Sequence, residues 1–252
     1  MDFDSQLLWT SVGRTDVGLV RKRNEDAHLV HPRYTLWAVA DGMGGHAFGD
    51  FASAAVVDAL AGLPPPANLA DFIALARDRL ERVNEALRLE ARTRLVPMIG
   101  STVVALYACG NEAACLWAGD SRSYLFRQGR LQQLTRDHSQ LEALKDSGAD
   151  LTTTLASPNM ITRAVGAADT IEFDVTTLPV RDGDVFLLCS DGLSTPVDEA
   201  AIAATLAPGD CARAAGELIA LALANGGRDN ITVVVARAED QSGDKTVVNP
   251  AL

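Results

Sequence analysis

Short apolar runs rich in β-forming residues recur along most of this 252-residue chain and limit its possible folds more than any other feature. Gly110-Asn111 separates two of these runs at hairpin spacing, and Gln128-Gly129 follows a third in the same way. Such short connections join antiparallel strands, because a parallel pair needs a crossover of about a dozen residues or more. The sequence therefore predicts antiparallel sheets, with strands over residues 35–40, 101–109, 113–118, 123–126, 171–178, 185–190 and 231–237.

Helical periodicity occupies the segments between these runs. Asn68 can cap a long helix, and further helices are predicted over residues 50–60 and 210–225. Ser139 to Glu142 has the spacing of a capping box that opens a short helix. We expect one α+β domain over residues 1–240, with helices covering the sheets, and a loose tail over 241–252. The apolar stripe predicted for the long helix is Leu69, Phe72, Ala76, Leu80, Val83 and Leu87.

Composition excludes several classes of protein. Hydrophobic residues make up 48% of the chain, which is enough for a full core and excludes general disorder. The formal charge of −11, from 22 basic and 33 acidic residues, argues against binding to nucleic acid or to anionic membranes. No uncharged run is long enough to span a bilayer, and the first residues are acidic rather than basic, so we expect a cytoplasmic protein without a secretory signal. The cysteines show no CxxC spacing and are expected to be reduced and mostly buried: Cys109, Cys115, Cys189 and Cys211.

Four aspartates lie at the ends of predicted strands. Asp41 and Asp191 directly follow apolar runs, Asp120 follows another, and Asp229 comes two residues before the last. An Asp-Gly pair alone indicates a turn, as we expect for Asp182-Gly183. A carboxylate at the edge of an apolar core is costly unless it is paired or binds a cation, and nearby arginines are too few. Oxygen ligands favour Mg²⁺ or Mn²⁺ over zinc, so the sequence predicts such a site.

The segment from Arg21 to Asp26 allows two interpretations. It is either a solvated charged loop, or it places Glu25 and Asp26 beside a metal with an arginine that binds phosphate through two hydrogen bonds. Metal ions and an arginine along one rim suit phosphoryl transfer to water. Competing chemistries lack their motifs, because the chain has no GxxxxGK[ST] loop, no GxSxG elbow and no cysteine followed by arginine six positions later.

An ordered series of motifs resembles the bacterial metal-dependent Ser/Thr phosphatases of the protein phosphatase 2C family. The matching segments are SVGRTDVGLVRKRNEDA at 11–27, LWAVADGMGGHAFGD at 36–50, IGSTVVAL at 99–106, WAGDSRSYLFRQGRLQQLTRDHS at 117–139, ITRAVG at 161–166, FLLCSDGL at 186–193 and GGRDNITVVVAR at 226–237. This resemblance implies a four-layer αββα sandwich of two antiparallel sheets flanked by helices, with a metal cluster at one end. The segment 140–163 corresponds to the variable flap beside the site.

The resemblance also implies roles for individual residues. Two Mn²⁺ or Mg²⁺ ions are expected, together with a third, weaker ion held by Asp120 and Asp191. Arg21 would bind the substrate phosphate, Asp26 would hydrogen-bond to metal-bound water, and Asn230 would orient the aspartate before it. The ligands of the first two ions would be Glu25, Asp41, the Gly42 carbonyl, Asp191 and Asp229.

The implied reaction is direct hydrolysis of phosphoserine and phosphothreonine in proteins by a water activated between two cations, with Asp41, Asp191, Asp229 and Arg21 as the catalytic set. Met43 replaces a histidine that some relatives carry, so a metal-bound water, or alternatively His46, would protonate the leaving group. We expect a monomer that reverses the action of a cognate Ser/Thr kinase on its substrates. The alternative is a catalytically silent relative that binds phosphoproteins as a regulator, but every expected metal position is filled.

Overall fold

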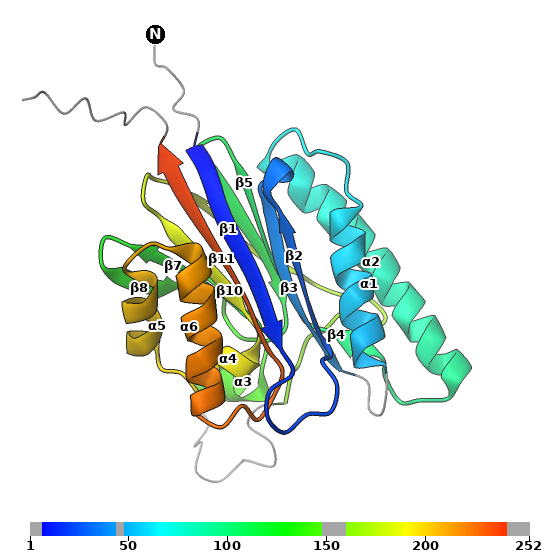
Figure 1. Cartoon of the computed structure of the whole chain (residues 1–252). Helices are drawn as coiled ribbons and strands as arrows, with labels where there is room; N and C mark the ends of the chain where they lie inside the picture. The colour runs from blue at the N-terminus through cyan, green and yellow to red at the C-terminus, as the bar shows by residue number, and fades with distance from the viewer. Residues whose placement is uncertain (1–6, 44–47, 148–159, 241–252) are drawn as a thin grey trace, which may run out of the picture.

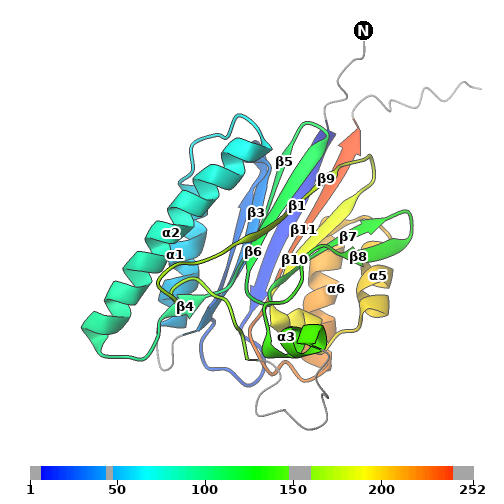
Figure 2. The ribbon, with the colours of Figure 1, turned by 180° about the vertical axis from the view of Figure 1, so that it is seen from behind.

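The computed structural model describes residues 7–43, 48–147 and 160–240. In these ranges the strands form two antiparallel sheets (Figures 1 and 2). The first sheet has the order β1 (Leu7–Asp16), β11 (Ile231–Asp240), β10 (Val185–Cys189), β7 (Arg122–Arg127) and β8 (Arg130–Gln133). The second sheet has the order β2 (Asp26–His31), β3 (Leu36–Met43), β5 (Val103–Cys109), β6 (Glu112–Ala118) and β9 (Asp174–Pro179), and the short β4 (Gly100–Ser101) pairs with β3.

Helices cover the outer face of each sheet, which gives four layers (Figure 1). Helices α1 (Gly49–Ala61) and α2 (Leu69–Arg94) pack on the second sheet, and α5 (Glu199–Leu206) and α6 (Cys211–Ala224) pack on the first. The remaining helices are short: η1 (Pro32–Tyr34), α3 (Gln140–Ser147) and α4 (Asp191–Ser194). The predicted αββα sandwich is confirmed. No helix of the described ranges is long and apolar enough to cross a bilayer.

Three apolar clusters fill the three interfaces between the layers, and strand periodicity explains why. Along β10, Val185 and Leu187 pack towards the helices, whereas Phe186 and Leu188 pack between the sheets. Successive side chains of a strand point to opposite faces, so a strand buried on both faces needs an unbroken apolar run. The runs that dominate the sequence are therefore the central strands of this sandwich.

The helix ends follow the local signals. Asn68 caps α2 by accepting a hydrogen bond from the Asp71 N–H, and Asp210 caps α6 by accepting one from the Arg213 N–H. The capping box at Ser139 opens α3. The predicted apolar stripe of α2 packs against the second sheet, with Leu69 and Val83 partly buried at its margin. The sequence did not indicate Asn84, which is fully buried beside Val83.

Strand predictions failed mainly at the sheet edges. Strands β1 and β2 are edge strands, half-buried and rich in polar residues, and carry no apolar run. The run at 101–109 is divided at Thr102 into β4 and β5, and the run at 171–178 becomes β9 only from Asp174 onward. The four cysteines are free, and three of them are buried.

The two ends of the sandwich differ in character. The hairpin end carries the exposed turns at Gly110, Gly129 and Gly183, where an added β-carbon would meet nothing within 4 Å. Leu7 and Asp240, register partners in β1 and β11, lie at this end too. The opposite end, which we call the carboxylate end, contains the residues that follow β3, β6 and β10 and those that precede β2 and β11 (lower end in Figure 1). The predicted site residues that the structure describes belong to this end.

Candidate metal centre

Both sheets contribute aspartates to the carboxylate end. Asp26 and Asp41 are register partners in β2 and β3 of the second sheet. Asp191 begins α4 just after β10, and Asp229 lies in the loop just before β11; β10 and β11 are strands of the first sheet. The Ser190 hydroxyl donates a 2.7 Å hydrogen bond to Asp26 Oδ2, which joins the two sheets at this point. Asp120 follows β6, so five of the predicted acids share one end of the molecule.

Their electrostatics show that these carboxylates face one space. Burial raises the pKa of Asp26 to about 6, with Asp191 and Asp229 adding repulsion, although hydrogen bonds from Thr232 and Ser190 oppose the shift. Burial and the charges of the other aspartates hold the pKa of Asp41 well above its usual range. Burial, followed by the charges of Asp191 and Asp137, raises the pKa of Asp120 to about 7. Burial and Asp229 raise that of Asp191. Full ionisation of these carboxylates at neutral pH therefore requires an additional positive charge close to them.

Unsatisfied oxygens point to the same conclusion. Asp26 Oδ1, Asp120 Oδ1 and Asp191 Oδ1 are buried and have no hydrogen-bond partner. Buried polar atoms are normally paired, so a buried oxygen without a protein partner indicates a bound water or ion. A donor set made only of oxygens fits Mn²⁺ or Mg²⁺. Among the described residues, no three His, Cys, Asp or Glu side chains already lie close enough together to hold one ion.

The Glu25 side chain and the Gly42 carbonyl both lie close to Gly49. A β-carbon on Gly49 would lie 2.7 Å from the Gly42 oxygen and 2.8 Å from Glu25 Oε1. A β-carbon on Gly42 would lie 2.0 Å from the Gly49 oxygen. The Gly42 N–H also donates to the Glu25 carbonyl at 3.0 Å. Only glycines allow these segments to approach so closely, and the approach places a carbonyl and a carboxylate oxygen near one point.

Arg21 is the cation that faces this cluster. Its Nη2 donates to Asp229 Oδ2 at 2.6 Å, and its side chain is about half exposed. The hydrogen bond and charge of Asp229 raise the pKa of the guanidinium, and Glu25 and Asp41 add to the effect. The guanidinium therefore lies at the mouth of the cluster, within reach of an incoming anion.

Asn230 fastens the loop that carries Arg21. Its side-chain Oδ1 accepts from the Glu25 N–H at 2.8 Å, and its Nδ2 donates to the carbonyls of Val17 and Arg23 at 2.9 Å each. Its contact with the preceding Asp229 is through its backbone N–H, at 2.9 Å to Oδ1. Its side chain thus orients the loop of Arg21 and Glu25, a role that the sequence did not indicate. His46 and the centre of the 140–163 flap lie outside the described residues.

Hydroxyl groups adjacent to the aspartates were missed from the sequence. Thr102 Oγ1 accepts from the Asp41 N–H at 2.9 Å and shares a 2.7 Å hydrogen bond with Ser121 Oγ. This chain of bonds connects the backbone at Asp41 to the residue after Asp120. The only sequence signal is adjacency, because Ser190 and Ser121 each flank a predicted ligand.

A family model and several known proteins match this chain over most of its length. A family model described as protein phosphatase 2C matches residues 20–221. The Mycobacterium tuberculosis Ser/Thr protein phosphatase PstP is 40% identical over 239 residues, which are 92% of this chain and 46% of that protein, so the chain spans about half of PstP. The Listeria monocytogenes Ser/Thr phosphatase Stp is 32% identical over 90% of this chain and 94% of its own length.

Solved structures show the same fold. PppA, titled a key regulatory component of T6SS in Pseudomonas aeruginosa, superposes with a TM-score of 0.87 at 44% identity and covers 92% of this chain and 98% of its own. The PstP catalytic domain in complex with two manganese ions superposes with a TM-score of 0.83 at 38% identity, covering 93% of this chain and all of its own. The predicted resemblance is confirmed: this chain belongs to the protein phosphatase 2C family.

Proposed function

We propose that this protein hydrolyses phosphoserine and phosphothreonine in proteins at a binuclear Mn²⁺ or Mg²⁺ centre, with a third, weaker ion, and so reverses the action of a Ser/Thr kinase. The observation that carries the proposal is the set of buried aspartates from both sheets, three with an unpartnered oxygen, beside Arg21. The Ser/Thr phosphatase names of its relatives support the substrate class.

The proposed ligands of the first two ions are Glu25, Asp41, the Gly42 carbonyl, Asp191 and Asp229, and those of the third are Asp120 and Asp191. Bound divalent cations supply charge neutralisation for phosphate and lower the pKa of a coordinated water. Asp26 is fixed through Oδ2 by Ser190, so its buried Oδ1 is available to orient a water. Arg21 exchanges Asp229 for the substrate phosphate, which its planar guanidinium can bind through two hydrogen bonds.

The cysteines support direct hydrolysis rather than a thiolate route. Burial raises the pKa of Cys115 and of Cys189 to about 12, and that of Cys211 to about 11. A thiol attacks phosphorus only as its thiolate, which these three groups do not form at neutral pH. These three cysteines are therefore poor nucleophiles, which supports attack by water in the proposed reaction.

The test is hydrolysis of p-nitrophenyl phosphate and of a phosphothreonine peptide. We expect activity that requires Mn²⁺ or Mg²⁺, stops with EDTA, persists after thiol alkylation and is lost in Asp191→Asn. Asp198→Asn is the matched control, because it removes only the exposed cap of α5 and should leave activity intact. Full metal-dependent activity in Asp191→Asn would refute the proposed centre, and phosphopeptide binding by a loaded but inactive wild type would indicate the regulator instead.

A further inference from the structure

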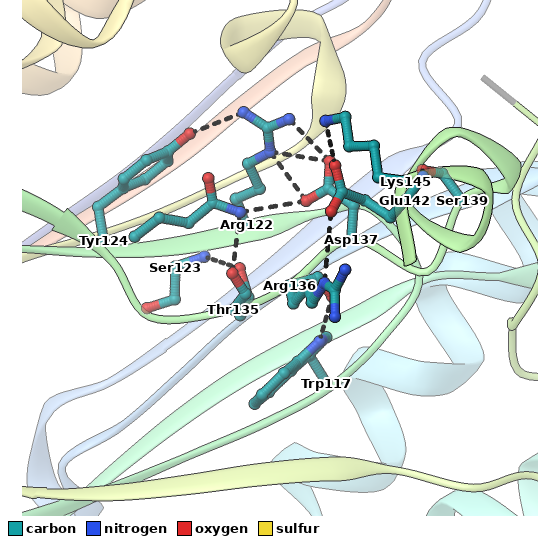
Figure 3. A network of polar contacts seen from close by, with 11 residues as sticks. Trp117, Arg122, Ser123, Tyr124, Thr135, Arg136, Asp137, Ser139, Glu142 and Lys145 are labelled. Atoms are coloured by element: carbon teal, nitrogen blue, oxygen red, sulfur yellow. Dashed lines mark hydrogen bonds and ion pairs between the residues drawn. The ribbon is translucent and has the colours of Figure 1, made fainter. Parts of the chain in front are cut away.

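The residues on both sides of Asp120 are fastened to the segment 136–138 by hydrogen bonds, of which Figure 3 shows those of Trp117 and Arg122. Trp117 Nε1 donates to the Arg136 carbonyl at 2.9 Å. The Gly119 N–H donates to His138 Nδ1 at 3.1 Å, and the His138 N–H donates back to the Gly119 carbonyl at 2.9 Å. The backbone just before Asp120 is therefore held in both directions by one histidine.

On the other side of Asp120, Arg122 forms a bidentate ion pair with Asp137 (Figure 3). Arg122 Nε donates to Oδ1 at 2.9 Å and Nη2 donates to Oδ2 at 2.7 Å, while Nη1 donates to the Tyr124 hydroxyl at 3.1 Å. Gln133 Nε2 adds a 3.2 Å bond to Asp137 Oδ1. This geometry is the strong fork-to-fork form of the interaction and fixes the orientation of both side chains.

Asp120 differs from its neighbours in its hydrogen bonding. Gly119 and Arg122 are tied to 137–138, and Ser121 is tied to Thr102, yet the buried Oδ1 of Asp120 has no partner. A rigid backbone that presents a free carboxylate oxygen is the arrangement of a preorganised ligand. The same segment leads directly into α3, which begins at Gln140, and Arg136 pairs with Glu142 of that helix.

We propose that Asp137 and His138 are positioning residues that hold Asp120 ready for the third, weaker divalent cation. The inference rests on the proposed function, since it concerns the ion assigned there to Asp120 and Asp191. Groups that orient a metal ligand typically contribute about 10–100-fold to metal affinity. Loss of the Asp137 charge would also leave the Arg122 guanidinium unpaired, and Arg122 already acts electrostatically on both Asp120 and Asp191. The freed guanidinium would then compete with the cation.

The fold provides a matched control on the same strand. Arg127, at the other end of β7, forms an equivalent bidentate pair with Asp184, at 2.7 and 2.6 Å. Asp184 is even more buried than Asp137, with 1% against 14% of its side chain exposed. Asp184→Asn therefore costs at least as much stability as Asp137→Asn but lies at the hairpin end, away from Asp120.

The experiment is a Mn²⁺ titration, by calorimetry and by the EPR signal of free Mn²⁺, of the wild type, Asp137→Asn, Asp184→Asn and Asp120→Asn. We expect Asp120→Asn to abolish the weakest class of sites and Asp137→Asn to weaken that class about tenfold or more. The tighter classes should be unchanged, and Asp184→Asn should match the wild type. The inference is overturned if Asp137→Asn leaves the weak class unchanged, or if Asp137→Asn and Asp184→Asn weaken all classes equally.

A second pair of variants tests His138 independently. His138→Ala removes the acceptor for the Gly119 N–H, whereas His138→Asn places an amide oxygen close to the position of Nδ1. We expect the alanine variant to weaken the third class and the asparagine variant to restore it; equal affinities would refute the role of His138. Failure of the proposed function is distinguishable, because wild type that binds no Mn²⁺, or an Asp120→Asn variant that loses no class, contradicts the metal assignment itself.

Discussion

Metal-free protein in which Asp120 is replaced by asparagine should become more stable than the wild type as the pH rises. Burial and the charges of Asp191 and Asp137 raise the pKa of the Asp120 carboxyl from 3.8 to about 7. Between about pH 4 and pH 7, the folded protein thus keeps the Asp120 proton while the unfolded chain has released it. Folding stability consequently falls as the pH rises through this window, and the full loss is present above pH 7. Asparagine has similar volume and does not titrate.

The size of the effect follows from the same pKa values. The folded pKa lies about two pH units above pH 5. At about 1.36 kcal/mol per unit, the wild type loses about 3 kcal/mol of its free energy of unfolding over this range. Urea unfolding in EDTA at pH 5 and pH 8 measures it. We expect the stability of Asp120→Asn relative to the wild type to increase by about 2–3 kcal/mol between the two pH values. Saturating Mn²⁺ should reduce this difference at pH 8, since both proteins keep the tighter sites and only the wild type gains stability from the third ion.

Asp198→Asn is the control for this experiment. Asp198 caps α5 in an exposed position, so its replacement should shift stability by the same amount at pH 5 and pH 8. A difference between Asp120→Asn and wild type that stays constant with pH would refute the reasoning. So would a variant that is less stable than the metal-free wild type at pH 8.

Two further substitutions test other parts of the structure. Arg21→Ala should raise KM for a phosphopeptide by about tenfold or more, as expected for a lost charged hydrogen bond, whereas the exposed Lys22→Ala should leave it nearly unchanged; equal steady-state KM values would remove Arg21 from the phosphate site. Asn84→Ala should lower the free energy of unfolding by about 1–3 kcal/mol, because the buried Gly166 N–H loses its partner at 2.7 Å, while the carbonyl of the exposed Ala168, now bonded at 3.1 Å, can turn to water. Glu85→Ala, on the exposed face of α2, is its control in urea unfolding, and a similar loss there would contradict this account.

The sequence predicted the central strands and the aspartates because both leave local signals. A strand buried on both faces requires a continuous apolar run. An aspartate directly after such a run lies at the edge of the core, where its charge needs a partner or a cation. Edge strands such as β1 and β2 need no such run, so pattern alone did not reveal them.

The supporting contacts were hidden for a different reason. Ser190 and Asp26 are 164 residues apart, and Arg122 reaches Asp137 only because β7 and β8 fold back on each other. Spacing along the chain carries no information about such pairs. The buried Asn84 was missed because a polar residue on a helix normally indicates the solvent face, and only its two backbone partners from 166–168 explain its burial.

The pairing of β1 with β11 has a consequence for joining this domain to others. Leu7 and Asp240 face each other at the hairpin end, on the far side of the molecule from Arg21 and the aspartates. A fusion partner attached at either point would leave the approach of a phosphoprotein clear. The same proximity makes the fold suited to circular permutation, with residues 7 and 240 bridged by a short linker and new termini opened in the exposed turn at Gly110.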